Sequence, residues 1–211
     1  MEYHWSVAQR VAFIIAAWLI DYTRLMSIKS LKGHLLLATK MLVDPNFARS
    51  VVLILDHSDD GAAGVILNRP VKKTIADIAE EVFNIQSDWQ KPLHLGGPVS
   101  GPLAAAHTIK EMADMEVMPG IYGSLAPEHL QKLIKKRQEP TLFLVNYAGW
   151  GPGQLEDEID EDAWLVMPAR TEHLFWTKDQ DLWEACIAEA SVSTMDTALG
   201  IRIKPRDPRM N

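Results

Sequence analysis

Short apolar runs that stop at glycine, proline or a turn recur along this chain of 211 residues and limit the folds open to it. Residues 50–55 read SVVLIL and precede the turn-forming DDG at 59–61. Residues 61–70 (GAAGVILNRP) form a second run, in which Asn68-Arg69-Pro70 is expected to end the strand. Because a turn joins the two β-rich runs, they predict an antiparallel hairpin.

Further strands are expected downstream of this hairpin. Residues 141–147 (TLFLVNY) are rich in β-branched and aromatic side chains and give the strongest strand prediction in the chain. Residues 93–95 (LHL) run into Gly96-Gly97-Pro98, where the proline lacks the N–H that a ladder needs. Residues 102–108 and 116–122 predict short strands, although the first segment fits a helix equally well.

Three helices are expected among these strands. Thr74 and Asp77 resemble a capping box at the start of a helix over residues 75–83. A second helix follows Ser124, and its apolar face carries Leu130, Leu133 and Ile134. A third, amphipathic helix is expected after Asp179. Many short strands with a few helices indicate the α+β class and disfavour a doubly wound parallel sheet.

The pattern divides the chain into one domain and two flanking segments. The expected domain covers residues 29–200, because a chain of this length buries one core and shows no linker or repeat. Residues 1–28 are expected to be an N-terminal extension, and residues 201–211 a basic, disordered tail.

The extension contains the apolar run VAFIIAAWLI at residues 11–20. This run is too short to span a bilayer as a helix, so no integral membrane association is expected. A signal peptide is disfavoured by Glu2 and by the lack of a small-residue cleavage site before Lys29. The favoured interpretation is that Met26 is the native start, or that residues 1–25 form a loosely attached helix.

Charge and cysteine content narrow the class of protein. The formal net charge of -7 disfavours a broad electrostatic contact with DNA or RNA, so direct nucleic-acid binding is not expected. A small basic patch in the tail (Arg202, Lys204, Arg206 and Arg209) keeps DNA binding as a third hypothesis. Cys186 is the only cysteine, which excludes an intramolecular disulfide and predicts a cytoplasmic protein.

Four stretches, taken together, resemble the YqgE/AlgH family. They are LKGHLLLAT with DPNFARSVVLILDH at 31–57, GAAGVILNRP at 61–70, LHLGGPV at 93–99, and NYAGWGPGQLEDEI with AWLVMP at 146–168. The resemblance covers about residues 29–185. It implies a branched, largely antiparallel β-sheet curled into a pseudo-barrel with helices packed outside. Some family members carry the label of transcriptional regulator, and no enzymatic reaction is agreed for the family.

Two motifs invite a ligand but fit one poorly. The segment 149–153 (GWGPG) lies where a phosphate-binding loop would lie, yet Pro152 removes an N–H and the acidic residues after it repel phosphate. We therefore expect a tight turn that places Trp150 over one end of the core. The acidic run at 156–162 lacks the EF-hand spacing, so a solvated helix face is expected and no metal or cofactor is predicted.

The alternative function is that of a hydrolase-like enzyme. It would use His57, His94 or His107, which lie at strand ends, with Glu156 as acid and base. No G-x-S-x-G elbow accompanies a serine, so no catalytic residue is predicted in the favoured interpretation. The alternative requires that two of these side chains come within hydrogen-bond reach of each other.

The favoured function is that of a non-catalytic, cytoplasmic binding or regulatory protein whose partner is another protein or a small ligand. The candidate ligand-binding residues are Asn68, Arg69, Gly96, Gly97 and Trp150, where motifs at strand ends are expected to converge. Arg69 offers bidentate recognition of an anion, and Asn68 offers an amide. Such a site would bind a small carboxylate or the end of a peptide.

Overall fold

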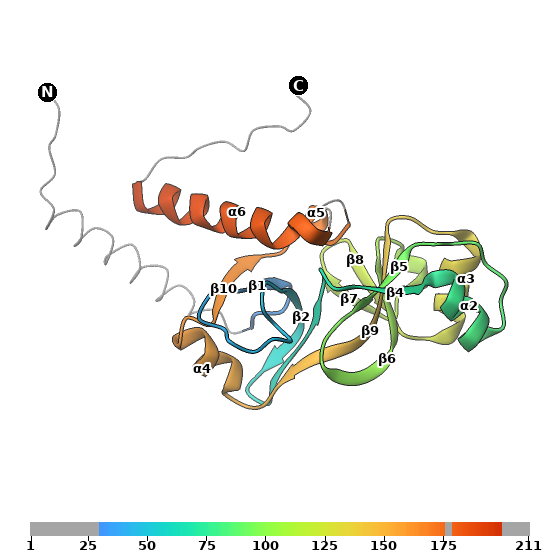
Figure 1. Cartoon of the computed structure of the whole chain (residues 1–211), viewed down its shortest axis with the longest axis horizontal. Coiled ribbons are helices and arrows are strands. Elements are labelled where there is room, and N and C mark those ends of the chain that lie inside the picture. Colours follow the sequence, from blue (N-terminus) through green and yellow to red (C-terminus); the bar gives the residue numbers. More distant parts are fainter. Residues whose placement is uncertain (1–29, 176–178, 200–211) are drawn as a thin grey trace, which may run out of the picture. The chain divides into compact units, whose positions relative to one another are not determined.

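Ten strands and five α-helices make up the described part of the chain, residues 30–175 and 179–199, in this computed structural model (Figure 1). Residues Ser30–Cys186 form one compact unit. The strands are β1 (His34–Ala38), β2 (Val51–Ser58), β3 (Gly61–Ile66), β4 (Pro70–Thr74), β5 (Pro92–Leu95), β6 (Val99–His107), β7 (Met115–Met118), β8 (Ile121–Ser124), β9 (Thr141–Trp150) and β10 (Trp164–Pro168). The helices are α2 (Ile75–Phe83), α3 (Pro127–Lys136), α4 (Gln154–Asp160), α5 (Thr171–Phe175) and α6 (Asp179–Leu199), with a 3-10 turn, η1, at Lys110–Met112.

The sheet branches at β9, its longest strand. The main path runs β10-β1-β2-β3-β9-β6-β8-β7, and β5 also pairs with β9 and carries β4. The first half of β9 lies between β5, which is parallel to it, and β6, which is antiparallel. Beyond the bend at Asn146, whose φ is 67°, residues 148–150 pair with β3 in place of β5. β9 therefore belongs to both halves of the sheet.

The expected fold class is confirmed. The chain is α+β, and its branched, curled sheet is antiparallel at every pairing except that of β5 with β9. The predicted hairpin is β2 and β3, and residues 102–108 fall largely in β6 and form no helix.

Two predicted strand boundaries need correction. Strand β3 ends at Ile66, and Pro70, expected only as a stop, begins β4. A proline is tolerated there because it is the first residue of its strand. The expected strand at 116–122 is split into β7 and β8 by a turn at Gly120, which adopts a φ of 79°.

The predicted helix starts are confirmed, but the two helices are capped differently. Thr74 and Asp77 form the capping box of α2. Ala126, the residue before α3, has no side chain that can cap. Asp114, from the loop before β7, instead fixes the two residues that lead into the helix by accepting the N–H groups of Leu125 at 2.6 Å and of Ala126 at 2.7 Å.

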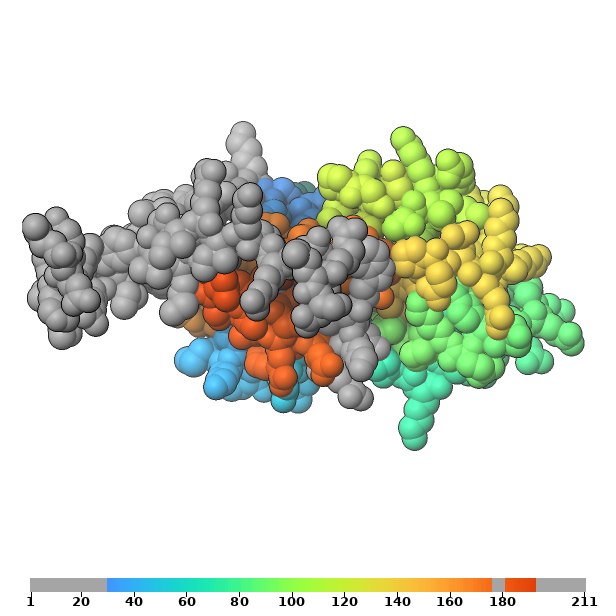
Figure 2. Space-filling view, turned by 90° about the horizontal axis from the view of Figure 1, so that it is seen from above, coloured from blue at the N-terminus to red at the C-terminus, as the bar shows by residue number. Residues whose placement is uncertain are grey.

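The principal core lies between the β6–β9 part of the sheet and helices α2 and α3. It contains Ile75, Leu93, Leu130, Leu133 and Phe143, each at most 2 % exposed. Figure 2 shows the green and yellow segments that contain these elements next to one another at one end of the Ser30–Cys186 unit. The apolar faces predicted for these helices are therefore the buried faces.

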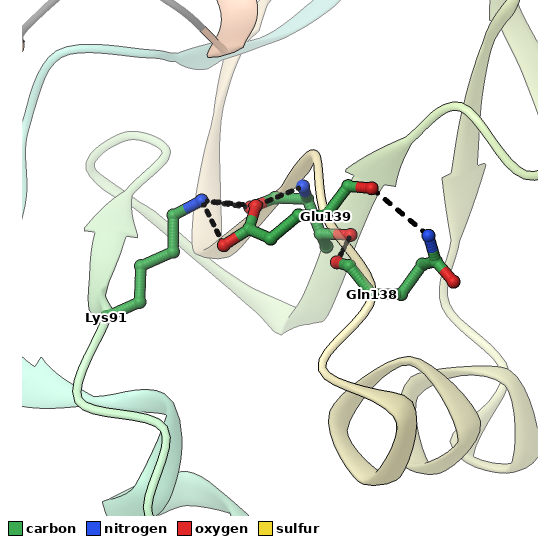
Figure 3. A network of polar contacts seen from close by, with 4 residues as sticks. Lys91, Gln138 and Glu139 are labelled. Carbon is green, nitrogen blue, oxygen red and sulfur yellow. Dashed lines mark hydrogen bonds and ion pairs between the residues drawn. The ribbon is translucent and has the colours of Figure 1, made fainter.

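A polar network fixes the chain where it enters β9 (Figure 3). The Lys91 ammonium group donates to both carboxylate oxygens of Glu139, at 2.9 and 3.1 Å, and to the carbonyl of Thr141. The Glu139 carboxylate also accepts the N–H of Thr141, while the Thr141 hydroxyl donates to the carbonyl of Gln138. These bonds tie the loop after α3 to the start of β5, and so align β9 with its parallel neighbour.

The predicted extension, residues 1–28, and the tail, residues 201–211, lie outside the described residues. Within the described residues, none of the helices combines the length and the apolar character needed to cross a bilayer.

Candidate functional site

A loop at residues 44–50 connects most of the residues that the sequence singled out. The Asp44 carboxylate accepts the N–H of Asn46, and the Asp44 carbonyl accepts the N–H groups of Phe47 and Ala48. Arg49 adopts a φ of 55° at the end of this turn. Its guanidinium forms an ion pair with Glu184 and lies 5.0 Å from the ring centroid of Trp183, both on α6. The loop is thus held in a defined conformation.

Asn68 and Arg69 hold the same loop from the side of β3. The Asn68 side chain, 8 % exposed, accepts the N–H of Val51 at 3.0 Å and donates to the carbonyl of Arg49 at 2.9 Å. The Arg69 guanidinium donates to the carbonyl of Ala48. Burial lowers the pKa of Arg69 from its ordinary value, although an arginine stays cationic in such a setting. Both polar side chains therefore bond to the backbone of the 44–50 loop.

Gly96 and Gly97 lie where the chain crosses β9 at close range. A Cβ at Gly96 would be 2.4 Å from the carbonyl oxygen of Asn146, and one at Gly97 would be 2.2 Å from that of Tyr147. Real Cβ atoms do not approach so closely, so only glycine fits at either position. The GGP segment thus follows the bend of β9 at Asn146.

Trp150 is buried, as expected, in an aromatic cluster that covers one end of the β2–β3 region. The cluster consists of Phe47, Trp150 and Trp164, with ring centroids 5.6 to 6.2 Å apart. Both indole N–H groups donate to the same Glu158 oxygen, at 2.9 and 2.8 Å. The carboxylate on α4 thereby satisfies two donors that burial would otherwise leave without water.

The predicted convergence of site residues is found only in part. Arg69 lies beside the GGP segment, because Leu95 donates its N–H to the Arg69 carbonyl at 2.8 Å and Ile66 donates to that of Gly96. Trp150 pairs with Ala62 at the other end of β3, and the 44–50 loop is the link between it and Arg69. The assignment of these residues to a ligand stays a prediction.

Sequence reasoning missed an exposed apolar surface beside Arg69. Leu95, Val99 and Tyr147 are 36 to 37 % exposed. Val99 pairs with Tyr147, and Arg69 lies opposite Leu95 in continuation of the Pro70–His94 pair. The available signal was the presence of these three apolar residues beside glycines in the runs LHLGGPV and NYAGW. We call Arg69, Leu95, Val99 and Tyr147 the Arg69 surface.

The histidine and carboxylate of the hydrolase alternative do meet. His57 Nε2 lies 2.7 Å from Glu156 Oε1. However, the N–H of Leu31 points at His57 Nδ1 at 2.9 Å, so Nδ1 accepts and Nε2 carries the proton that is donated to Glu156. The ring has no vacant lone pair with which to take a proton from a substrate in this arrangement.

His107 and Ser124 also form a hydrogen bond, but its direction is opposite to that in a catalytic dyad. The N–H of Ile109 donates to His107 Nδ1, so Nε2 donates to the Ser124 hydroxyl at 2.7 Å. Ser124 then donates its own proton to the carbonyl of Met112. Desolvation by burial lowers the pKa of His107, the nearby His129 lowers it further, and Asp114 acts in the opposite direction. A neutral histidine that donates to a serine does not activate it as a nucleophile.

The remaining candidates have structural positions. His94 is 2 % exposed on β5, where it pairs with Leu144 of β9. The acidic run begins on α4 with most of its side chains exposed, as a solvated helix face requires. In the described ranges no three histidine, cysteine or acidic side chains are placed to hold a metal ion together.

Comparison with known proteins agrees with this architecture. The AlgH-like family profile matches residues 35–195, which is most of the chain. The chain belongs to the AlgH-like family. A UPF0301 protein of Chlorobaculum tepidum is 34% identical over 161 residues, covering 74% of this chain and 84% of that protein. A UPF0301 protein of Streptomyces coelicolor is 34% identical over 192 residues, covering 87% and 97% respectively.

Two solved structures support the same fold. The solution structure of the AlgH protein from Pseudomonas aeruginosa superposes with a TM-score of 0.64 at 28% identity, over 83% of this chain and 92% of that one. The crystal structure of protein DIP2367 from Corynebacterium diphtheriae has a TM-score of 0.60 at 24% identity, over 74% of this chain and 85% of that one. The second likeness concerns the fold alone.

Proposed function

We propose that this AlgH-like chain is a non-catalytic, cytoplasmic binding protein with a regulatory role, and that it recognises a carboxylate at the Arg69 surface. The carboxylate belongs to a small acid or to the C-terminal end of a peptide. The observation that carries the proposal is a partly buried arginine whose strand partner, Leu95, is exposed, together with the exposed Val99–Tyr147 pair that follows the same GGP segment.

The chemistry of this surface suits such a ligand. A guanidinium has five N–H groups, and the bond from Arg69 to Ala48 leaves donors for an incoming carboxylate. Apolar side chains flanking a single cation favour a ligand that has an apolar body and one negative end. The negative charge of the whole chain also argues for a protein or small molecule over a nucleic acid as the partner.

The non-catalytic part of the proposal is supported by the hydrogen bonds of the two histidines. His57 and His107 each accept a backbone N–H at Nδ1. Each ring therefore donates at Nε2, which is the wrong direction for a general base acting on a substrate.

The experiment compares two tetrapeptides that differ only in a free or amidated C-terminus, with binding followed by NMR chemical shifts of the 15N-labelled protein. We expect the free acid to shift the amides of residues 95–97, 99 and 145–147, and the amidated peptide not to. Arg69→Gln should abolish the difference, whereas the matched surface variant Arg137→Gln should keep it. Equal shifts with both peptides, or an unaltered response in Arg69→Gln, would refute the proposal.

A second function, that of a hydrolase-like enzyme, is favoured by one observation, the 2.7 Å contact between His57 and Glu156. It predicts ester or amide turnover that His57→Gln removes while the fold is retained. A panel of activated esters and peptides with no turnover above the His57→Gln background would exclude it.

A further inference from the structure

Strand β10 forms one end of the sheet. It pairs with β1 over five residues, and within the described residues no strand pairs with its other side. The sheet also ends at β7 and at β4. A sheet edge exposes a row of N–H and C=O groups that another strand can extend.

The hydrogen-bond pattern identifies which residues of β10 point outward. The carbonyl of Ala163 accepts from Thr39, and the N–H of Ala169 donates to Gly33, so these odd-numbered residues bond toward β1. The backbone N–H and C=O groups of successive residues point to opposite sides of a strand. The N–H and C=O groups of Trp164 and Val166, and the C=O of Pro168, therefore point away from the sheet.

This edge lacks the charged residues that protect the other two. Strand β7 carries Glu116, and β4 carries Lys72 and Lys73, all exposed. Strand β10 reads WLVMP, with no charge, and Leu165 is 44 % exposed. Charged side chains are the usual means by which an edge strand avoids pairing with another chain. Because β10 lacks such charges, nothing in its own sequence opposes pairing with another strand.

The sequence around β10 suits pairing with a second copy of itself. Residues 162–170 read DAWLVMPAR, and around Val166 the pattern is symmetric in hydrophobicity and antisymmetric in charge. Two antiparallel copies in register at Val166 place Leu165 opposite Met167 and Ala163 opposite Ala169. They also place Asp162 opposite Arg170, whose side chain is 55% exposed in its ion pair with Glu172. We propose that β10 pairs with β10 of a second copy of this chain, so that the sheet continues across a two-fold axis.

The backbone of this arrangement is consistent with the outward groups. The two Val166 residues exchange N–H···O=C bonds, and each Trp164 N–H donates to the Pro168 carbonyl of the second copy. Pro168, which has no N–H, lies at the end of the ladder, where the loss of one donor is tolerated. The interface is isologous, as a dimer of identical chains requires.

Engineered cysteines test the register directly in the full chain with Cys186→Ala, which removes the only native cysteine. Residues in a hydrogen-bonded antiparallel pair have Cα atoms about 5.5 Å apart, which suits a disulfide. Val166→Cys should therefore give a covalent dimer under mild oxidation. Leu165→Cys should not form this disulfide, because Leu165 lies opposite Met167 of the second copy and the two residues 165 are only diagonal neighbours. Met115→Cys, on the edge strand β7 and 43 % exposed, is the matched control and should also remain monomeric on a reducing-agent-free gel.

A charge exchange tests the same interface without cysteines. Arg170→Asp should weaken dimerisation about tenfold in sedimentation velocity, because it places two acidic groups opposite each other. Adding Asp162→Lys should restore it, while circular dichroism checks that each variant is folded.

The proposal is overturned if the wild-type chain stays monomeric in sedimentation velocity over a series of rising protein concentrations, which would mean that its own residues outside the described ranges, or another protein, cover the edge. It is also overturned if Leu165→Cys or Met115→Cys cross-links as readily as Val166→Cys. A dimer that persists unchanged in Arg170→Asp would place the interface elsewhere.

Discussion

Replacing Asp114 tests whether one carboxylate, distant in sequence, sets the start of helix α3. Asp114 accepts two backbone N–H groups, from Leu125 and Ala126, and the ring Nδ1 of His129 at 2.7 Å. A buried hydrogen bond to a charged acceptor contributes about 1.5–3 kcal/mol net of the exchange with water, and less where water still reaches the acceptor. Since the Asp114 side chain is 25% exposed, we expect Asp114→Ala to cost about 2 kcal/mol, and Asp114→Asn about half as much.

The measurement is urea unfolding followed by circular dichroism. With an m-value of about 2 kcal/mol/M, a loss of about 2 kcal/mol lowers the midpoint by about 1 M. Asp88→Asn is the control, because the Asp88 side chain is 87% exposed in its ion pair with Arg137, and such a pair is worth little. A midpoint for Asp114→Ala that matches Asp88→Asn would refute the role of Asp114 in fixing the start of α3.

The pH dependence of the same variant gives an independent check. Hydrogen bonds from Ala126 and Leu125, and then the contact with His129, lower the pKa of Asp114 below 3.8. A depressed carboxyl pKa stabilises the folded state above the unfolded pKa, and the stabilisation is lost as the pH falls through the folded pKa. The difference between wild type and Asp114→Asn should therefore be full at neutral pH and shrink below about pH 4.

Three further substitutions give sharp expectations. Glu158→Gln should shift the tryptophan emission and cost about 1–2 kcal/mol, because one carboxylate oxygen accepts both buried indole N–H groups; unchanged emission and stability would contradict that role. Asn68→Ala should cost about 2–3 kcal/mol in thermal or urea unfolding, because it leaves the N–H of Val51 and a carbonyl without a partner; a loss below about 0.5 kcal/mol would show that water replaces the amide. Gly97→Ala should cost more than about 3 kcal/mol or prevent folding, because its Cβ would overlap the backbone of Tyr147; a soluble variant of wild-type stability would show that the GGP segment moves freely.

Local features of the fold were predictable from the sequence because they depend on neighbours along the chain. The hairpin of β2 and β3 follows from two β-rich runs and a turn, and the start of α2 follows from Thr74 and Asp77. The branch at β9 is different, since its three partner strands lie far away in sequence and only the family resemblance implied it. The hydrogen bonds from Asp114 to the residues before α3 could not be predicted for the same reason, because Asp114 lies twelve residues before Ala126.

The sequence predicted where the polar residues of the candidate site lie, but not which groups they bond to. The sequence singled out Asn68 and Arg69 as polar residues at a strand end, but could not show that the 44–50 loop would take up their hydrogen bonds. His57 and Glu156 were paired correctly as neighbours within the hydrolase hypothesis. The tautomer that removes the free lone pair of His57 depends on the N–H of Leu31, a contact with no signature in the sequence.

The position of β9 in both halves of the sheet affects how the molecule opens. Its residues 141–147 pair with β5 or β6, and its last three residues, 148–150, pair with β3. Neither half can detach from the other without breaking the ladder of the strand they share. The amide protons of β9 should therefore exchange with solvent only when the whole Ser30–Cys186 unit unfolds. The shared strand makes the two halves of the sheet unfold as one cooperative unit.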